Sequence, residues 1–151
     1  MRKINYLEEE LKENWKLDSP QKIVNKILER ETGKREGIDK ILDTEKLVGC
    51  SYALGEILAK SARLKVGSLR KFYQSLMSIK GEKDDRKIRD KVLSLKPYLS
   101  YETARKRREV TPLFEVLNPL LERVYNRKDY LKLCQFLEAV IAYHKFHGGH
   151  D

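Results

Sequence analysis

The stretch FLEAVIAYHKFHGG, residues 136–149, decides the fold class of this chain. Its apolar residues continue a stripe that recurs every three or four positions, as on one side of an α-helix. The stripe predicts a helix from about Lys128 to His147 and comprises Tyr130, Leu133, Cys134, Leu137, Val140, Ile141 and His144. Gly148 follows at the position where a helix commonly ends in a left-handed cap.

Every other periodic segment of the chain has the same helical period. No segment alternates apolar and polar residues for long, and the clusters of Val, Ile and Thr that are typical of strands are absent. The sequence therefore predicts an all-α protein, a compact bundle of about five helices with an N-terminal helical extension. We place the extension at residues 1–43 and the helical-bundle domain at residues 44–151.

Capping residues predict where several helices begin. Ser19 followed by Pro20 is typical of a helix start, with the serine as N-cap and the proline in the first helical position. Thr44 is the expected cap of the next long helix. Ser68, after Val66 and Gly67, is the expected cap of the one that follows.

Prolines predict further boundaries. Pro97 is expected to end a helix, because the residue before a proline is pushed out of the α region. Thr111-Pro112 and Asn118-Pro119 each pair a capping residue with a proline. Pro119 is therefore expected either to kink a helix or to begin a new one.

Positive charge is concentrated in one third of the chain. The formal net charge is +9; residues 60–110 hold 16 Lys or Arg against 6 Asp or Glu, whereas the rest holds 16 against 17. These counts give balances of +10 and −1. A solvated helical face normally mixes the two signs more evenly, so the imbalance predicts a surface that faces a polyanion. Nucleic acid is the first candidate partner and an acidic protein is the second.

Residues 69–80 form an amphipathic segment within that third. Its apolar positions follow the helical period and are predicted to face the core: Leu69, Phe72, Tyr73 and Leu76. Arg70 is predicted to lie on the outer, polar face of this helix, with Lys71 next to it. Guanidinium and ammonium groups suit phosphate oxygens, although a plain amphipathic helix explains the same periodicity.

The segment KPYLSYETARKRR, residues 96–108, places two tyrosines before a basic run. Helical spacing predicts that Tyr101, Arg105 and Arg108 share one face, where they would meet the same nucleic-acid strand. Tyr98 and Tyr101 could stack on bases, but buried tyrosines with satisfied hydroxyl groups are commoner. A basic run on a helix is also commonly just solvated.

Taken in order, three motifs of this chain resemble the small subunit of type III-A CRISPR effector (Csm) complexes. They are LRKFY from Leu69, LKPYLSY from Leu95, and AYHK from Ala142; the resemblance covers roughly residues 45–149. The resemblance implies a non-catalytic subunit that stacks in several copies along an RNA-guided interference complex in antiviral defence. It implies contacts with the guide RNA (crRNA) and target RNA, with the backbone and large subunits, and with further small subunits.

The resemblance and the charge pattern together predict RNA binding through phosphates, without sequence preference, because any guide must be accepted. The predicted RNA-binding residues are Arg70, Lys71, Lys96, Tyr101, Arg105, Lys106, Arg107, Arg108 and Lys145. The N-terminal extension resembles nothing that assigns it a role.

The histidines near the end of the chain are predicted to be structural. His144, His147 and His150 are spaced at three-residue intervals, but His150 lies beyond two glycines and no Cys or buried carboxylate is expected nearby. A tetrahedral metal site needs a fuller ligand set, so neither a metal nor a cofactor is expected. The resemblance makes Tyr143 and His144 structural and leaves Lys145 facing outward.

An enzyme is not expected. The chain has no G-x-S-x-G motif, no P-loop glycine array and no Cys–His pair in a usable context. The adjacent carboxylates Asp84 and Asp85 lie in a polar turn, where burial cannot tune their pKa for catalysis.

Two other classes of protein fit the charge pattern. A helix-turn-helix-like DNA-binding protein would need base-reading Asn, Gln or Ser among its arginines, and residues 105–108 offer none. A helical module whose basic face docks an acidic protein partner is the second alternative.

Cysteine use and hydropathy predict a cytoplasmic protein with no membrane partner. Cys50 and Cys134 lie far apart and are expected to be small core residues in a reducing compartment. The chain contains no apolar run long enough for a signal peptide or a membrane helix.

Overall fold

The computed structural model describes residues 6–151, and its regular elements are helices. In chain order they are α1 (Leu7–Trp15), α2 (Pro20–Leu28), α3 (Ile38–Ile41), α4 (Thr44–Glu56), the π-helical segment η1 (Ile57–Ser61), α5 (Val66–Met77), α6 (Asp85–Leu93), α7 (Leu95–Arg105), α8 (Arg107–Leu121) and α9 (Arg127–Phe146). None of these described residues lies in a β-strand. The all-α prediction is confirmed, and the helices are more numerous than the five or so expected.

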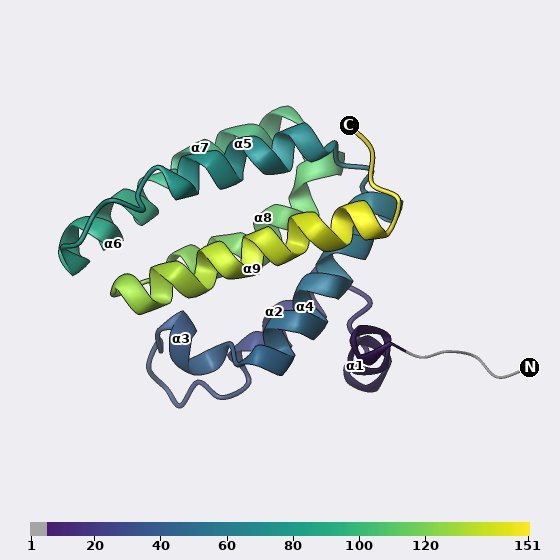
Figure 1. Cartoon of the computed structure of the whole chain (residues 1–151), viewed down its shortest axis with the longest axis horizontal. Helices are drawn as coiled ribbons and strands as arrows, with labels where there is room; N and C mark the ends of the chain where they lie inside the picture. The colour runs from purple at the N-terminus through teal and green to yellow at the C-terminus, as the bar shows by residue number, and fades with distance from the viewer. Residues whose placement is uncertain (1–5) are drawn as a thin grey trace, which may run out of the picture.

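The helices form layers around α8 and α9 (Figure 1). Helices α5 and α7 lie side by side above this pair, with α6 at their far end, and α2 and α4 lie below it. Helix α9 contacts α3, α4, α5 and α6, so it is the central element of the bundle. Gly55 allows the close approach of α4 and α9, because a Cβ at Gly55 would lie 2.8 Å from the backbone nitrogen of His144.

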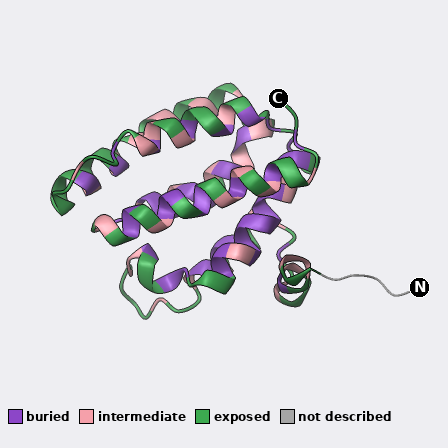
Figure 2. Cartoon of the chain, viewed as in Figure 1, coloured by how far each residue is buried: buried purple, intermediate pink, exposed green. Residues whose placement is uncertain are grey.

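The core is continuous through the bundle. Its fully buried side chains come from both layers and include Ile23, Leu54, Leu69, Val116 and Phe136. Burial of this kind is the main source of stability in a helical domain. The outer side of the layer formed by α5 and α7 is largely exposed (Figure 2).

Helices α1–α3 pack on the rest of the chain rather than forming a separate core. Helix α1 contacts α4, α2 contacts α4 and α8, and α3 contacts α9. The buried carboxylate of Asp129 fixes α3, because it accepts hydrogen bonds from the backbone amides of Asp39 (2.9 Å) and Tyr125 (3.0 Å). Gly37 makes room for it, since a Cβ there would lie 2.5 Å from an Asp129 oxygen. The division of the chain at residues 43 and 44 stays a prediction.

Several helix ends differ from those predicted. Ser19 caps α2 as expected, and its side chain accepts a hydrogen bond from the amide of Lys22. Asp43, not Thr44, caps α4 by accepting from the amide of Lys46 at 2.9 Å. Helix α5 begins at Val66, so Ser68 lies inside its first turn instead of capping it.

Pro97 and Pro112 act differently from the prediction, and of the two alternatives left open for Pro119 the structure excludes the helix start. Pro97 lies in the first turn of α7, where a missing N–H has no intrahelical partner to lose. Pro112 and Pro119 both lie inside α8, and neither begins a helix. Both side chains are half-buried, and the neighbouring Leu113, Val116, Leu117 and Leu120 are buried. That packing stabilises α8 despite the lost backbone hydrogen bonds.

The predicted end of α9 is confirmed. His147 is the C-cap and Gly148 follows with φ +88°. The amide of Gly149 donates to the carbonyl of His144 at 2.8 Å and that of Gly148 to Lys145 at 3.0 Å, which is the Schellman arrangement. No helix of residues 6–151 combines the length and the apolar character needed to cross a membrane.

Candidate nucleic-acid interface

Three hollows meet where α5 begins beside the junction of α7 and α8. The first is lined by Lys71, Arg105 and Lys106 at its mouth, over the apolar side chains of Phe72 and Tyr98. The second, of about 370 Å³, is lined by Lys65, Arg70, Lys71 and Lys106. The third, of about 250 Å³, is lined by Arg63, Lys65 and Lys106. We call these six residues the basic surface: Arg63, Lys65, Arg70, Lys71, Arg105 and Lys106.

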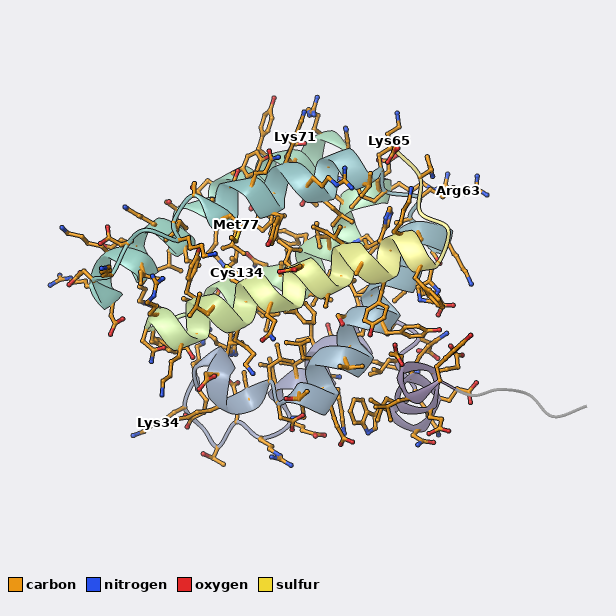
Figure 3. The ribbon with its side chains drawn as sticks, viewed as in Figure 1. Lys34, Arg63, Lys65, Lys71, Met77 and Cys134 are labelled. Atoms are coloured by element: carbon orange, nitrogen blue, oxygen red, sulfur yellow. The ribbon has the colours of Figure 1, made fainter. Side chains whose placement is uncertain are left out.

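Local backbone structure brings the start of α5 to this position. The π-helical segment η1 ends α4, and Arg63 follows in the left-handed conformation with φ +55°. The chain then turns into α5, whose first amide, that of Val66, donates to the carbonyl of His150 at 2.9 Å. Arg63, Lys65 and Lys71 all project outward along this edge (Figure 3).

A break in the helix at Lys106 supplies the other side of the surface. Its backbone angles, φ −133° and ψ 61°, separate α7 from α8 inside the basic run. Tyr101 and Arg105 belong to α7 and Arg108 to α8, so the prediction that the three share one helix face is wrong. The break brings Lys106 into all three hollows instead.

The charges of the basic surface are largely uncompensated. Within residues 6–151, the side chains of Arg63, Lys65, Arg70, Lys71 and Lys106 make no ion pair and no hydrogen bond. Arg105 contacts Glu102 at 3.2 Å, an exposed pair of the kind that contributes little to stability. Glu102, Glu109 and Asp151 also line the hollows, so the basic residues outnumber the acidic ones there by six to three. Cations held this close without partners favour binding of an anion.

Lys96 is placed differently from the other predicted RNA-binding residues. Its ammonium group lies 2.7 Å from the carboxylate of Glu122 and donates to Oδ1 of Asn118 at 2.8 Å. The hydrogen bond from Lys96 is the main cause that lowers the pKa of Glu122. Lys96 and Arg105 lie near opposite ends of α7, about 13 Å apart along the helix axis.

The two tyrosines of α7 have different surroundings. Tyr101 is exposed by 65% and lies one turn before Arg105, so its ring is free for stacking. Tyr98 is half-buried and stacks on Phe72, with ring centroids 6.1 Å apart and planes 3° apart. Burial is the main cause that raises the pKa of Tyr98.

The remaining predicted residues lie outside the hollows. Arg107 and Arg108 are exposed in the first turn of α8, next to Lys106. Lys145 is exposed in the last turn of α9. None of the three lines the basic surface of the described chain.

The C-terminal histidines help to hold this end of the bundle together. His144 is fully buried, as predicted, and its Nε2 donates to the carbonyl oxygen of Leu64 at 2.6 Å. The ring of His147 packs on Tyr52, with centroids 4.5 Å apart. Burial lowers the pKa of both histidines. Within residues 6–151, no three His, Cys, Asp or Glu side chains are grouped closely enough to hold a metal ion.

Both cysteines are buried thiols. Cys50 lies in the core, where burial raises its pKa to about 12, and burial also raises the pKa of Cys134. A thiol with a raised pKa is a poor nucleophile, because the thiolate is the reactive form.

Arg63 and Lys65 are the basic residues that sequence motifs did not single out. Both fall inside the positively charged third of the chain, so the charge count includes them. Their position depends on the π-helical turn at residues 57–61, for which the sequence has no recognisable signal.

A family comparison gives a match over most of the chain. A model of the family described as Csm2 Type III-A matches residues 42–150. No match was found among curated proteins or among solved structures.

Proposed function

The chain belongs to the Csm2 family of type III-A CRISPR systems, and from this premise we propose that its basic surface binds the phosphate backbone of guide and target RNA. The family makes the protein a small subunit of a type III-A CRISPR complex. In that role it performs no reaction of its own and holds RNA for the other subunits.

One observation carries this proposal: six basic residues from two distant segments converge on three adjoining hollows, and five of them have no partner within residues 6–151. Arginine can bind two phosphate oxygens at once, and lysine acts as a mobile point charge. Tyr101, one turn from Arg105, adds a ring on which an unpaired base can stack. Arg107 and Arg108 extend the positive field beyond the hollows.

Binding of this kind suits a guide–target duplex. An RNA-like duplex has a deep, narrow major groove that side chains do not enter, so a protein recognises its shape and its backbone. Phosphate contacts fix position without reading sequence, which a subunit that must accept any guide requires. We propose that copies of the chain stack along the RNA in the cytoplasm, beside the backbone subunits and toward the large subunit.

The test is the salt dependence of RNA binding by the purified chain and by its R70E/R105E double variant. Fluorescence anisotropy with a labelled single-stranded RNA, between about 50 and 200 mM salt, gives the slope of log K against log salt. Each neutralised phosphate contributes about −0.7 to that slope, so losing two contacts flattens it by about one to two units. The binding constant should not depend on RNA sequence.

A matched control separates a local surface from overall charge. The K22E/K40E variant reverses two exposed lysines on α2 and α3 and so has the same net charge as R70E/R105E. It should retain the wild-type slope. Equal losses in the two double variants, or binding by the wild type that ignores salt, would refute an RNA site at the basic surface.

A further inference from the structure

Five large apolar side chains are exposed among residues 6–151: Tyr6, Leu7, Tyr101, Leu131 and Phe146. Tyr101 belongs with the basic surface. The other four remain without a role in RNA binding, and large exposed apolar groups commonly mark interaction sites.

Three of the four lie at one end of the molecule, and we call them the apolar knob: Tyr6, Leu7 and Phe146. The ring of Phe146, at the end of α9, meets that of Tyr6 edge to face, with centroids 6.2 Å apart. Leu7 is exposed by 52% in the first turn of α1. That turn also contains Glu8, Glu9 and Glu10. Glu8 accepts a hydrogen bond from the hydroxyl of Tyr143 and Glu9 one from that of Tyr52, and both keep their charge. With the exposed Glu10 they outnumber the neighbouring Lys145, so the knob has an acidic border.

The fourth exposed residue, Leu131, lines an apolar groove between α5 and α9 of about 590 Å³. Its other apolar lining residues are Tyr73, Met77 and Cys134. Met77 and Cys134 lie in the space between the two helices (Figure 3). We call this the α5–α9 groove.

The rim of the groove is mostly basic. Lys80, Lys128 and Lys132 line it, against the two carboxylates of Asp39 and Glu138. Glu138 accepts a hydrogen bond from the hydroxyl of Tyr73 at 3.3 Å and keeps its charge, so the three lysines exceed the carboxylates of the rim by one. The groove is therefore complementary in polarity and in charge to the knob.

The knob of one molecule cannot fill its own groove. Leu131 and Phe146 lie near opposite ends of α9, and fifteen residues of helix separate them by about 22 Å. A contact between knob and groove must therefore join two molecules. Such a contact uses different surfaces on the two partners, so each copy added leaves a free knob and a free groove.

We infer that the apolar knob of one copy docks in the α5–α9 groove of the next, which builds an open-ended row of identical chains. In this contact the apolar side chains of the knob are buried against Tyr73, Met77 and Leu131, and the acidic border of the knob faces the lysines of the rim. This rests on the proposed function in one respect, that several copies lie along one RNA, and it assigns the surfaces by which they meet.

The experiment uses two single variants of the full chain, L131E in the groove and F146E in the knob. Both side chains are exposed, by 43% and 60%, so neither change should unfold the protein. Sedimentation velocity should show wild-type species that grow with concentration, whereas each variant alone stays monomeric. An equimolar mixture of the two should form a 1:1 dimer and nothing larger, because one intact knob and one intact groove remain.

A third variant, Y101E, controls for the loss of any exposed aromatic residue. It should self-associate like the wild type while binding RNA more weakly, so failure of the docking inference is distinguishable from failure of the RNA proposal. A wild type that stays monomeric both free and on RNA would overturn the inference, as would a mixture that does not dimerise. The inference would also be overturned if L131E still self-associated but no longer bound another subunit of the reconstituted complex. The groove would then be the binding site for that subunit.

Discussion

Two sets of basic residues in this molecule look alike in sequence and differ in what surrounds them. On the basic surface, Arg70 and Lys71 are exposed, with no ion pair to residues 6–151. At the other set, near the end of α8, Arg123 is buried against Glu31, with Nε and Oε2 2.6 Å apart, and Lys96 is held by Glu122. Arg35 contacts Glu122 as well.

Pairing with a carboxylate, and not charge alone, therefore determines which cations are available to a ligand. A paired cation would have to leave its carboxylate before it could bind phosphate, and the carboxylate would then repel the RNA. An exposed, unpaired cation can bind phosphate without breaking an ion pair and without leaving a carboxylate that repels the RNA. The paired set should therefore contribute to stability and the exposed set to RNA affinity.

The largest expected effect is on stability and comes from Arg123. Its guanidinium lowers the pKa of the Glu31 carboxyl, chiefly by hydrogen bonding, and also donates to the carbonyl of Pro119 at 2.7 Å. The R123M variant leaves Glu31 poorly solvated without its partner, so the free energy of unfolding should fall by about 3 kcal/mol. Urea denaturation followed by circular dichroism measures it.

The matched control is R35M, which removes an exposed arginine from the same network. Its stability should lie within about 0.5 kcal/mol of the wild type. If R123M matched this control, the buried pair would not hold α8 to the N-terminal helices as the structure indicates.

The second prediction compares two lysines that the sequence assigned to the same role, Lys96 and Lys71. K96M should lose about 1 kcal/mol of stability, because Glu122 and Asn118 lose a charged donor, and should keep the salt slope of RNA binding. K71M should keep its stability and flatten the slope by about 0.7. A K96M variant that weakens RNA binding without loss of stability would return Lys96 to the interface.

The helical fold could be predicted because the period of apolar residues was clear in every segment. The number of helices could not. The break at Lys106 occurs in sequence that a continuous helix also tolerates, and the boundary expected at Pro97 lies three residues earlier, at Ser94, because Pro97 fits the first turn of α7. Pro112 suggested a helix start that the structure does not have, whereas for Pro119 the sequence left a start or a kink open. Both prolines lie inside α8, because the burial of that helix overrides their local preference for a helix start.

The candidate interface was predicted in part. The sequence picked out Arg70, Lys71, Arg105 and Lys106, which the structure brings together at the hollows. It also assigned Lys96 to RNA binding. The pairing of Lys96 with Glu122 could not be foreseen, because the two residues are 26 positions apart and leave no local pattern in the sequence. Long-range pairs of this kind depend on the packing of α7 against α8.

A third prediction concerns pH and the histidines beneath the basic surface. Because burial lowers the pKa of His144 and His147, the unfolded chain binds more protons than the folded one. Stability is therefore complete above the ordinary histidine value of 6.5 and falls as pH drops below it. Thermal unfolding followed by circular dichroism should give a lower Tm at about pH 5.5 than at about pH 8.

The H144Q/H147Q variant tests the assignment of this pH dependence. Its Tm should vary less across the same range than that of the wild type, whatever its absolute value. H150Q changes an exposed histidine and should keep the wild-type dependence. If the Tm of H144Q/H147Q depended on pH as strongly as that of the wild type, other groups would be responsible. Glu31 and Glu122 are not among them, because their pKa values are lowered below the ordinary carboxyl range.

The smallest expected effect separates a focused surface from a diffuse positive field. R107Q/R108Q and R105Q/K106Q each remove two positive charges from adjacent positions, so any difference between them reflects position rather than net charge. Arg105 and Lys106 line the hollows, whereas Arg107 and Arg108 lie outside them at the start of α8. The R105Q/K106Q slope should therefore flatten by about one unit and that of R107Q/R108Q by about half as much. Identical slopes would mean that the RNA meets the whole basic run at long range, and the break at Lys106 would then have no part in binding.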